Sequence, residues 1–113
     1  MKIIMKLIRM MKMIEPNKIV EVRGIKGIDS AAGVTVRLPN KNLVLIIGKK
    51  GFIMCGYLDI ETAERFDDVA CIVTDVSTVD DILNAKIKAV TSNARSLGIR
   101  EGMSGREALK IIS

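Results

Sequence analysis

The sequence predicts an α+β fold in which N-terminal antiparallel strands continue into a mixed sheet flanked by C-terminal helices. Three observations support this. Short runs rich in β-branched residues fill the first half of the chain, turn residues separate these runs, and capping residues precede apolar helical patterns in the second half. Strands followed by helices are typical of the α+β class.

The first two predicted strands lie at residues 18–24 and 33–38. Apolar and polar residues alternate along both, in KIVEVRG and GVTVRL, as in strands with one exposed face. The segment IDSAAG between them and PNKN after them contain turn residues, and Pro39 ends the second strand.

A second pair of strands is predicted at residues 43–48 and 51–58, with the tight connection GKKG between them. Both runs, LVLIIG and GFIMCGYL, are apolar on both faces, and such strands must be covered on both faces. A chain of 113 residues offers few helices for this task. We therefore expect part of the cover to come from another subunit.

Three elements are predicted next. Asp59 is a good N-cap for a short helix over IETAERF (60–66), and the apolar run VACIVTDV (69–76) predicts a buried strand. Thr78 is followed three residues later by an acid, which favours a capped helix start there. That helical stretch is expected to run through residue 83.

The last third of the sequence predicts two helical segments. One is indicated by a stripe of apolar residues at helical spacing, formed by Ile87, Val90, Ala94 and Leu97. Gly98 is placed to end it in the left-handed conformation. Ser104 and Glu107 then form a near capping box that opens a terminal helix, REALKII (106–112).

Composition excludes several classes of site. The chain has no histidine, which excludes a Cys–His dyad, an imidazole base and a histidine metal ligand. Two cysteines cannot complete a four-ligand zinc site, and the acids lack calcium-loop spacing and suit turns and caps. We therefore predict neither a metal nor a cofactor. The acids considered are Asp67, Asp68, Asp75, Asp80 and Asp81.

The net charge of +5 comes mostly from the first twelve residues. The other 14 basic residues of the 18 nearly balance the 13 acidic ones, and aromatic residues make up only 3% of the chain. Nucleic acid is therefore an unlikely partner, because it calls for a broad basic surface or aromatic stacking platforms. The four basic residues concerned are Lys2, Lys6, Arg9 and Lys12.

We expect a cytoplasmic protein without a transmembrane segment. No apolar stretch approaches the roughly 18 residues of a membrane span, and residues 1–14 lack the apolar region and cleavage site of a signal peptide. Free thiols at Cys55 and Cys71 fit a reducing compartment, although a disulfide between them remains an alternative.

Residues 1–13 are predicted to be an N-terminal extension, and residues 14–113 a single α+β domain. On a helix, the four cations of the extension fall in one arc and apolar residues cover most of the remainder. This pattern is typical of a helix that binds a membrane surface or a partner. A poorly ordered extension is the alternative, and the one that we favour.

Cys55 is the first candidate for chemistry. Gly56 beside it permits close approach of a ligand, and the run ends near Asp59, at a helix start where amides favour a thiolate. With no histidine, Asp59, a lysine or a water would serve as base. The alternative is that Cys55 acts as a small core residue, which is the preferred interpretation for Cys71.

The segment GMSGRE (102–107) is the second candidate, as an anion site. Glycines on both sides of a serine let the chain turn into a helix whose first amides favour an anion. Two arginines can add forked donors to a carboxylate or phosphate, and an ordinary helix cap is the alternative. The candidate ligand-binding residues are Gly56, Arg100, Gly102, Ser104, Gly105 and Arg106.

Five segments together resemble the YunC-like family of small bacterial and archaeal proteins, a domain of unknown function. They are VTVRLPNKNLVLI (34–46), GFIMCGYLD (51–59), TVDDILNA (78–85), AVTSNARSLGI (89–99) and GMSGREAL (102–109). The resemblance covers residues 14–112. It implies an N-terminal β-sheet region that mediates tetramerisation, which agrees with the need for outside cover, and it implies no known reaction.

Taken together, the sequence favours a homo-oligomeric protein that binds a small anionic ligand or a protein partner. An enzyme that uses the Cys55 thiolate is the alternative. A membrane or RNA adaptor that acts through the cationic N-terminus is a weaker one.

Overall fold

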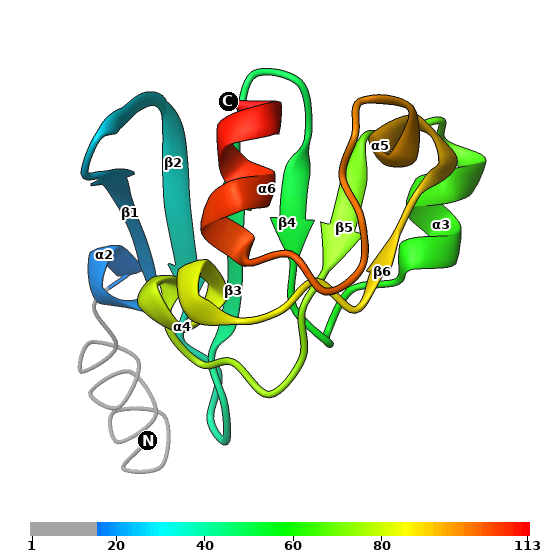
Figure 1. Cartoon of the computed structure of the whole chain (residues 1–113). Helices are drawn as coiled ribbons and strands as arrows, with labels where there is room; N and C mark the ends of the chain where they lie inside the picture. The colour runs from blue at the N-terminus through cyan, green and yellow to red at the C-terminus, as the bar shows by residue number, and fades with distance from the viewer. Residues whose placement is uncertain (1–15) are drawn as a thin grey trace, which may run out of the picture.

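The computed structural model of the chain describes residues 16–113, so the predictions for the N-terminal extension lie outside the described residues. Figure 1 shows the order of the elements along the chain. They are α2 (Pro16–Ile19), β1 (Val20–Ile25), β2 (Ile28–Val36), β3 (Leu43–Ile47), β4 (Phe52–Met54), α3 (Ile60–Arg65), β5 (Ala70–Ile72), α4 (Val79–Asn84), β6 (Ala89–Val90), α5 (Ser92–Ser96) and α6 (Gly105–Ile112).

The strands form one six-stranded sheet in the order β1-β2-β3-β4-β5-β6. Four of the five neighbouring pairs are antiparallel, and β4 and β5, which α3 connects, run parallel. The predicted α+β class, with N-terminal antiparallel strands that continue into a mixed sheet, is therefore confirmed.

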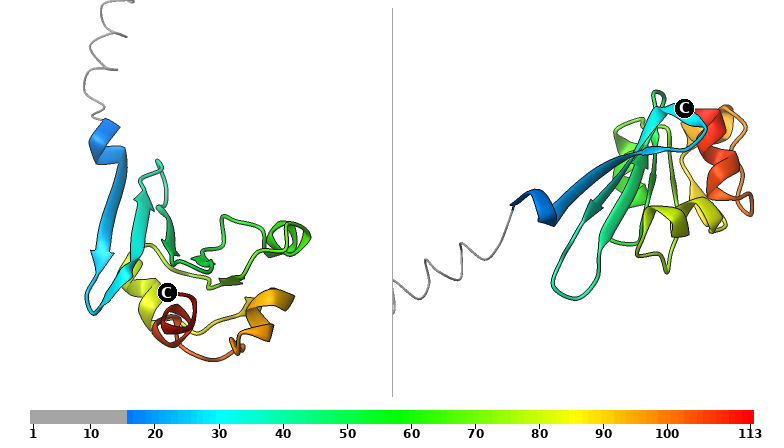
Figure 2. Two further views of the ribbon diagram at one scale, coloured as in Figure 1. Left: turned by 90° about the horizontal axis from the view of Figure 1, so that it is seen from above. Right: turned by 90° about the vertical axis from the view of Figure 1, so that its left-hand side faces the viewer.

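Helices lie on both faces of the sheet, but they cover unequal parts of it. Side chains of α4, α5 and α6 pack with inward residues of β3 to β5 in the main core, which includes Ile46, Ile53 and Cys71. On the opposite face α3 packs over β4 and β5 in a smaller cluster around Met54 and Ala63. Figure 2 shows α3 and α6 on opposite sides of the sheet.

The α3 face continues as an apolar surface across β1 to β3. Val22 pairs with Val34, Val34 with Leu45, and Leu45 with Met54, so these side chains share one face. Val22 remains 65% exposed and Ile47 46%. Of the two strands predicted to be apolar on both faces, 43–48 keeps Ile47 exposed, and cover of this surface by another subunit stays a prediction.

Several predicted strand boundaries were wrong, and the strand predicted over 69–76 ends at Ile72. The segment 28–33, predicted as a turn, belongs to β2 and pairs with β1 and β3, and the turn lies instead at Gly27, whose φ is +86°. The strand predicted over 51–58 ends at Met54, and a turn around Gly56 follows. The sequence did not predict this part of β2, because most residues of IDSAAG are depleted in strands. A small residue is required at Gly33, because Val79 packs closely on it.

The helix predicted from the apolar stripe was also wrong over its first part. Residues 86–91 form the edge of the sheet, where Ile87 exchanges backbone hydrogen bonds with Gly102 and Met103, and Lys88 and Thr91 donate to β5. Thr91 is 1% exposed, and its hydroxyl donates to Asp68 O and accepts from Ala70 N. These tertiary hydrogen bonds override the local helical spacing.

The predicted caps were correct. Asp59 caps α3, Thr78 and Asp81 form a capping box on α4, and Ser104 and Glu107 form one on α6. Gly98 follows α5 with φ at +101°, as expected for a helix stop. Within residues 16–113, no helix combines the length and apolar character needed to cross a bilayer.

Candidate functional sites

Cys55 lines a cavity of about 280 Å³ at the carboxyl ends of the two parallel strands. It directly follows β4, and Thr74, Asp75 and Val76 come just after β5. Lys41, from the loop between β2 and β3, lies on the remaining side with Tyr57 and Gly56. In sheets with parallel strands, ligands bind outside the carboxyl ends.

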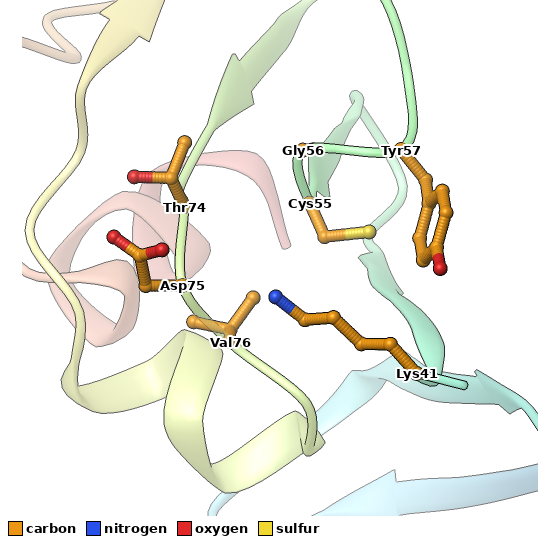
Figure 3. A pocket seen from close by; sticks show the side chains of 7 residues that line it. All are labelled: Lys41, Cys55, Gly56, Tyr57, Thr74, Asp75 and Val76. Atoms are coloured by element: carbon orange, nitrogen blue, oxygen red, sulfur yellow. The ribbon is translucent and has the colours of Figure 1, made fainter.

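Figure 3 shows the Cys55 sulfur and the Lys41 amine pointing into the space that these residues line, whereas the Asp75 carboxylate points away from the thiol. Asp75 has φ at +60°, in the left-handed region that non-glycine residues seldom adopt. A thiol and a primary amine thus face this cavity.

The two cysteines are free, and both are buried. Cys71 is 0% exposed in β5, and burial raises its pKa from 9.0 to about 12, so it remains a neutral thiol. This agrees with its interpretation as a small core residue. Cys55 is 2% exposed, but it lines a cavity.

Asp59 lies apart from the cavity of Cys55. Its carboxylate accepts from Thr62 Oγ1 at 2.8 Å and from the Glu61 amide at 3.1 Å, and it borders a different cavity beside α3. The Thr62 hydroxyl, with the Glu61 amide, holds the pKa of Asp59 below its ordinary value. A carboxylate so engaged is a weak base, and its observed task is to cap α3.

Arg106 lines a second cavity, of about 290 Å³, between the β1–β2 turn and the helices α4 and α6. Of the residues that the structure describes, Arg23 and Lys26 add two further cations to the lining, and Asp80 alone adds an acid. Arg23 donates to Asp80 Oδ1 at 2.7 Å. Within residues 16–113, neither Lys26 nor Arg106 has a side-chain hydrogen bond or an ion pair.

The other residues predicted around 102–106 serve the fold. Arg100 donates to the carbonyls of Arg95 and Ile99, and Ser104 accepts from Glu107 N in the capping box. Gly102 has φ at +91°. Gly105 lies so close to α4 that a Cβ there would be 1.9 Å from the Ile82 oxygen. Of this group only Arg106 lines one of the cavities described here.

The structure therefore distributes the predicted site residues over separate cavities. Cys55 and Gly56 line one, Arg106 another, and Asp59 a third. Sequence analysis missed Lys41, Arg23 and Lys26, whose separation in sequence gives no signal that they approach these residues. Within the described part of the chain, no group of three or more acidic or cysteine side chains is arranged to hold a metal.

Comparisons with known proteins found one matching family model and similar proteins of unknown function. The family described as a domain of unknown function (DUF1805) matches residues 54–112. The uncharacterized protein YunC of Bacillus subtilis (strain 168) is 44% identical over 80 residues, which cover 67% of this chain and 79% of YunC. The crystal structure of a protein of unknown function, TA1206 from Thermoplasma acidophilum, superposes with a TM-score of 0.74 at 33% identity, covering 83% of this chain and 91% of that one.

Proposed function

This chain belongs to the DUF1805 family of domains of unknown function, and we propose that it is a homo-oligomeric protein that binds a small anionic ligand in the cavity lined by Arg106. The observation that carries the proposal is the charge of that cavity. Three cations and one carboxylate line it, and the carboxylate is already engaged by Arg23.

The three cations and one carboxylate of the cavity leave two positive charges in excess, which favours a ligand with at least two negative charges. Lys26 and Arg106 have no counter-charge within residues 16–113, so an anion gains two charge-assisted contacts without breaking existing pairs. A volume of about 290 Å³ is at the small end of ligand cavities. A short dicarboxylate fits both the charge and the volume of the cavity, and a diphosphate group supplies at least two negative charges in a similar volume.

The position of Arg106 in α6 supports the same conclusion. It is the second residue of an eight-residue helix, and a cation in the first turn is disfavoured by the helix dipole. A bound anion between Arg106 and the turn at Lys26 relieves this unfavourable arrangement. The carboxylate of Glu107 remains engaged in the capping box and takes no part.

Calorimetric titration with inorganic pyrophosphate and with succinate tests the proposal. Arg106→Ala is expected to weaken binding about 10- to 100-fold, since hydrogen bonds to charged groups contribute about 1.5–3 kcal/mol. Lys110→Ala is the matched control, because it removes an exposed cation from the same helix but outside the cavity. Equal affinities in all three proteins, or no binding by wild type, would contradict an anion site here.

The proposal includes assembly through the apolar face of β1 to β3. That face carries the exposed side chains Val20, Val22 and Ile47, and a second copy can cover it as the strands require. Tetramerisation through the N-terminal sheet region is the form that we propose. We also propose a cytoplasmic location, in which the two free thiols remain reduced.

A thiol-dependent reaction at Cys55 is a second candidate, favoured by the cavity at the ends of β4 and β5. There the Lys41 ammonium is positioned to stabilise negative charge that develops on a substrate attacked by the thiolate.

Alkylation by iodoacetamide in a Cys71→Ala background tests this candidate. Modification of Cys55 near neutral pH that is much faster than global unfolding is the expected result. Modification only at the rate of global unfolding would show that Cys55 is a core residue.

A further inference from the structure

The third cavity is an apolar groove beside α3, of about 270 Å³. Phe52, Met54, Leu58 and Phe66 supply apolar lining, and Phe66 is 73% exposed. Isolated exposed residues are common, but a large aromatic side chain at the edge of an apolar groove is typical of a contact surface.

The rim of this groove is acidic. Residues 59–68 carry five carboxylates and one guanidinium, a net formal charge of −4 in ten residues. Asp59 and Asp68 line the groove, and Asp67 precedes Asp68 in the sequence. The carboxylates of Asp67 and Asp68 have no ion pair within residues 16–113, whereas Asp59 caps α3 and Glu64 accepts from Ser92 N. An occupant of this groove must therefore be apolar on one side and cationic on the other.

Residues 1–14 of this protein have that composition. They contain four basic residues and no acid, a net charge of +4, and most of the others are isoleucine, leucine or methionine. The charge of this segment therefore matches that of residues 59–68 in magnitude and is opposite in sign. Methionine and isoleucine side chains suit a groove lined by phenylalanine, leucine and methionine.

The length of the segment permits contact within one chain. It precedes α2 at the β1 edge, and three inter-strand spacings, about 14 Å, separate β1 from β4. Fourteen extended residues span up to about 46 Å. The segment of a neighbouring copy has no such limit.

We propose that the acidic-rimmed groove between β4 and α3 binds the cationic, apolar segment 1–14 of this same protein. Apolar side chains of the segment fill the groove over Phe52 and Phe66, and its basic residues face Asp67 and Asp68. The contact is separate from the anion cavity at Arg106, and it adjoins the apolar face of β1 to β3, because Phe52 pairs with Ile47 and Met54 with Leu45.

Zero-length carbodiimide cross-linking of the full-length protein tests this, because it joins lysine amines only to carboxylates in direct contact. We expect cross-links from Lys2, Lys6 or Lys12 to the carboxylates of residues 59–68. A mixture of ¹⁴N- and ¹⁵N-labelled protein distinguishes the two supporting outcomes, contact within one chain and contact between copies.

Phe66→Ser is expected to lower the yield of these cross-links about tenfold, since aromatic side chains are enriched among the residues that contribute most to binding energy. Leu97→Ser is the matched control, because Leu97 is an exposed apolar residue outside the groove. Leu7→Ser keeps all four cations and the groove intact, and we expect it to reduce the yield as well.

Three results would overturn the proposal. They are the absence of cross-links between the segment and residues 59–68, unchanged yields in Phe66→Ser and Leu7→Ser, and preferential cross-linking to acids elsewhere, such as Asp29 or Glu101.

Discussion

At the scale of single residues, burial separates the two cysteines. Cys71 is enclosed in β5, where desolvation keeps it neutral, whereas Cys55 lies after the end of β4 at a cavity wall. The residues beside Cys71 predict its role, because Ala70 and Ile72 flank it in an apolar run. The cavity at Cys55 is formed by its own segment and by two segments that are distant in the sequence. The residues next to Cys55 therefore do not decide between a reactive thiol and a core residue.

The raised pKa of Cys71 predicts a pH dependence of stability. Between about pH 9 and 12 the unfolded chain loses the Cys71 proton while the folded protein keeps it, so the free energy of unfolding falls as pH rises. Relative to Cys71→Ala, wild type should lose up to about 1.4 kcal/mol per pH unit in this window. Urea denaturation of both proteins from pH 7 to 11 measures it, and parallel curves would contradict the assignment.

At the scale of elements, the sequence predicts features that depend on neighbouring residues. It does not predict features that depend on backbone partners far away in the sequence. The capping boxes of α4 and α6 could be predicted because each depends on side chains three positions apart. The strand at 28–33 and the edge segment at 86–91 could not, because their backbone partners lie in β1, β3 and β5 and at Gly102. Local periodicity carries no information about such partners.

Substitution by alanine at Gly56 and at Gly105, two of the predicted ligand-binding residues, should change the stability of the protein by different amounts. At Gly105 a Cβ would be 1.9 Å from the Ile82 backbone oxygen, so α6 must move from α4, and we expect Gly105→Ala to cost about 3 kcal/mol or more. At Gly56 a Cβ meets nothing within 4 Å, and Gly56→Ala should change stability by less than about 0.5 kcal/mol. Thermal unfolding compares them, and similar losses would refute the close packing at Gly105.

At the scale of the whole molecule, topology assembles the candidate sites. Cys55 and Arg106 could be nominated from their local sequence. Lys41 reaches Cys55 only because the β2–β3 loop lies beside the ends of β4 and β5, and Arg23 and Lys26 reach Arg106 only because the β1–β2 hairpin adjoins α6. The sequence thus indicated Cys55 and Gly56 in one cavity and Arg106 in the other, and none of their distant partners.

The apolar face of β1 to β3 predicts how assembly can be disrupted. Val22 is 65% exposed in the centre of β1, and Val22→Lys places a charge on that face without disturbing the main core. We expect the wild-type oligomer to dissociate in this variant, because burying an unpaired charge at an interface is strongly unfavourable. Sedimentation velocity measures it, with Leu97→Lys as the control; an unchanged oligomer would place the interface elsewhere.

Native mass spectrometry of the full-length protein with added pyrophosphate tests whether the protein is an oligomer that holds a small anion at Arg106. We expect an oligomer, most simply a tetramer, with one pyrophosphate per subunit, and strongly reduced occupancy in Arg106→Ala but not in Lys110→Ala. A monomer, or equal occupancy in all three proteins, would contradict it.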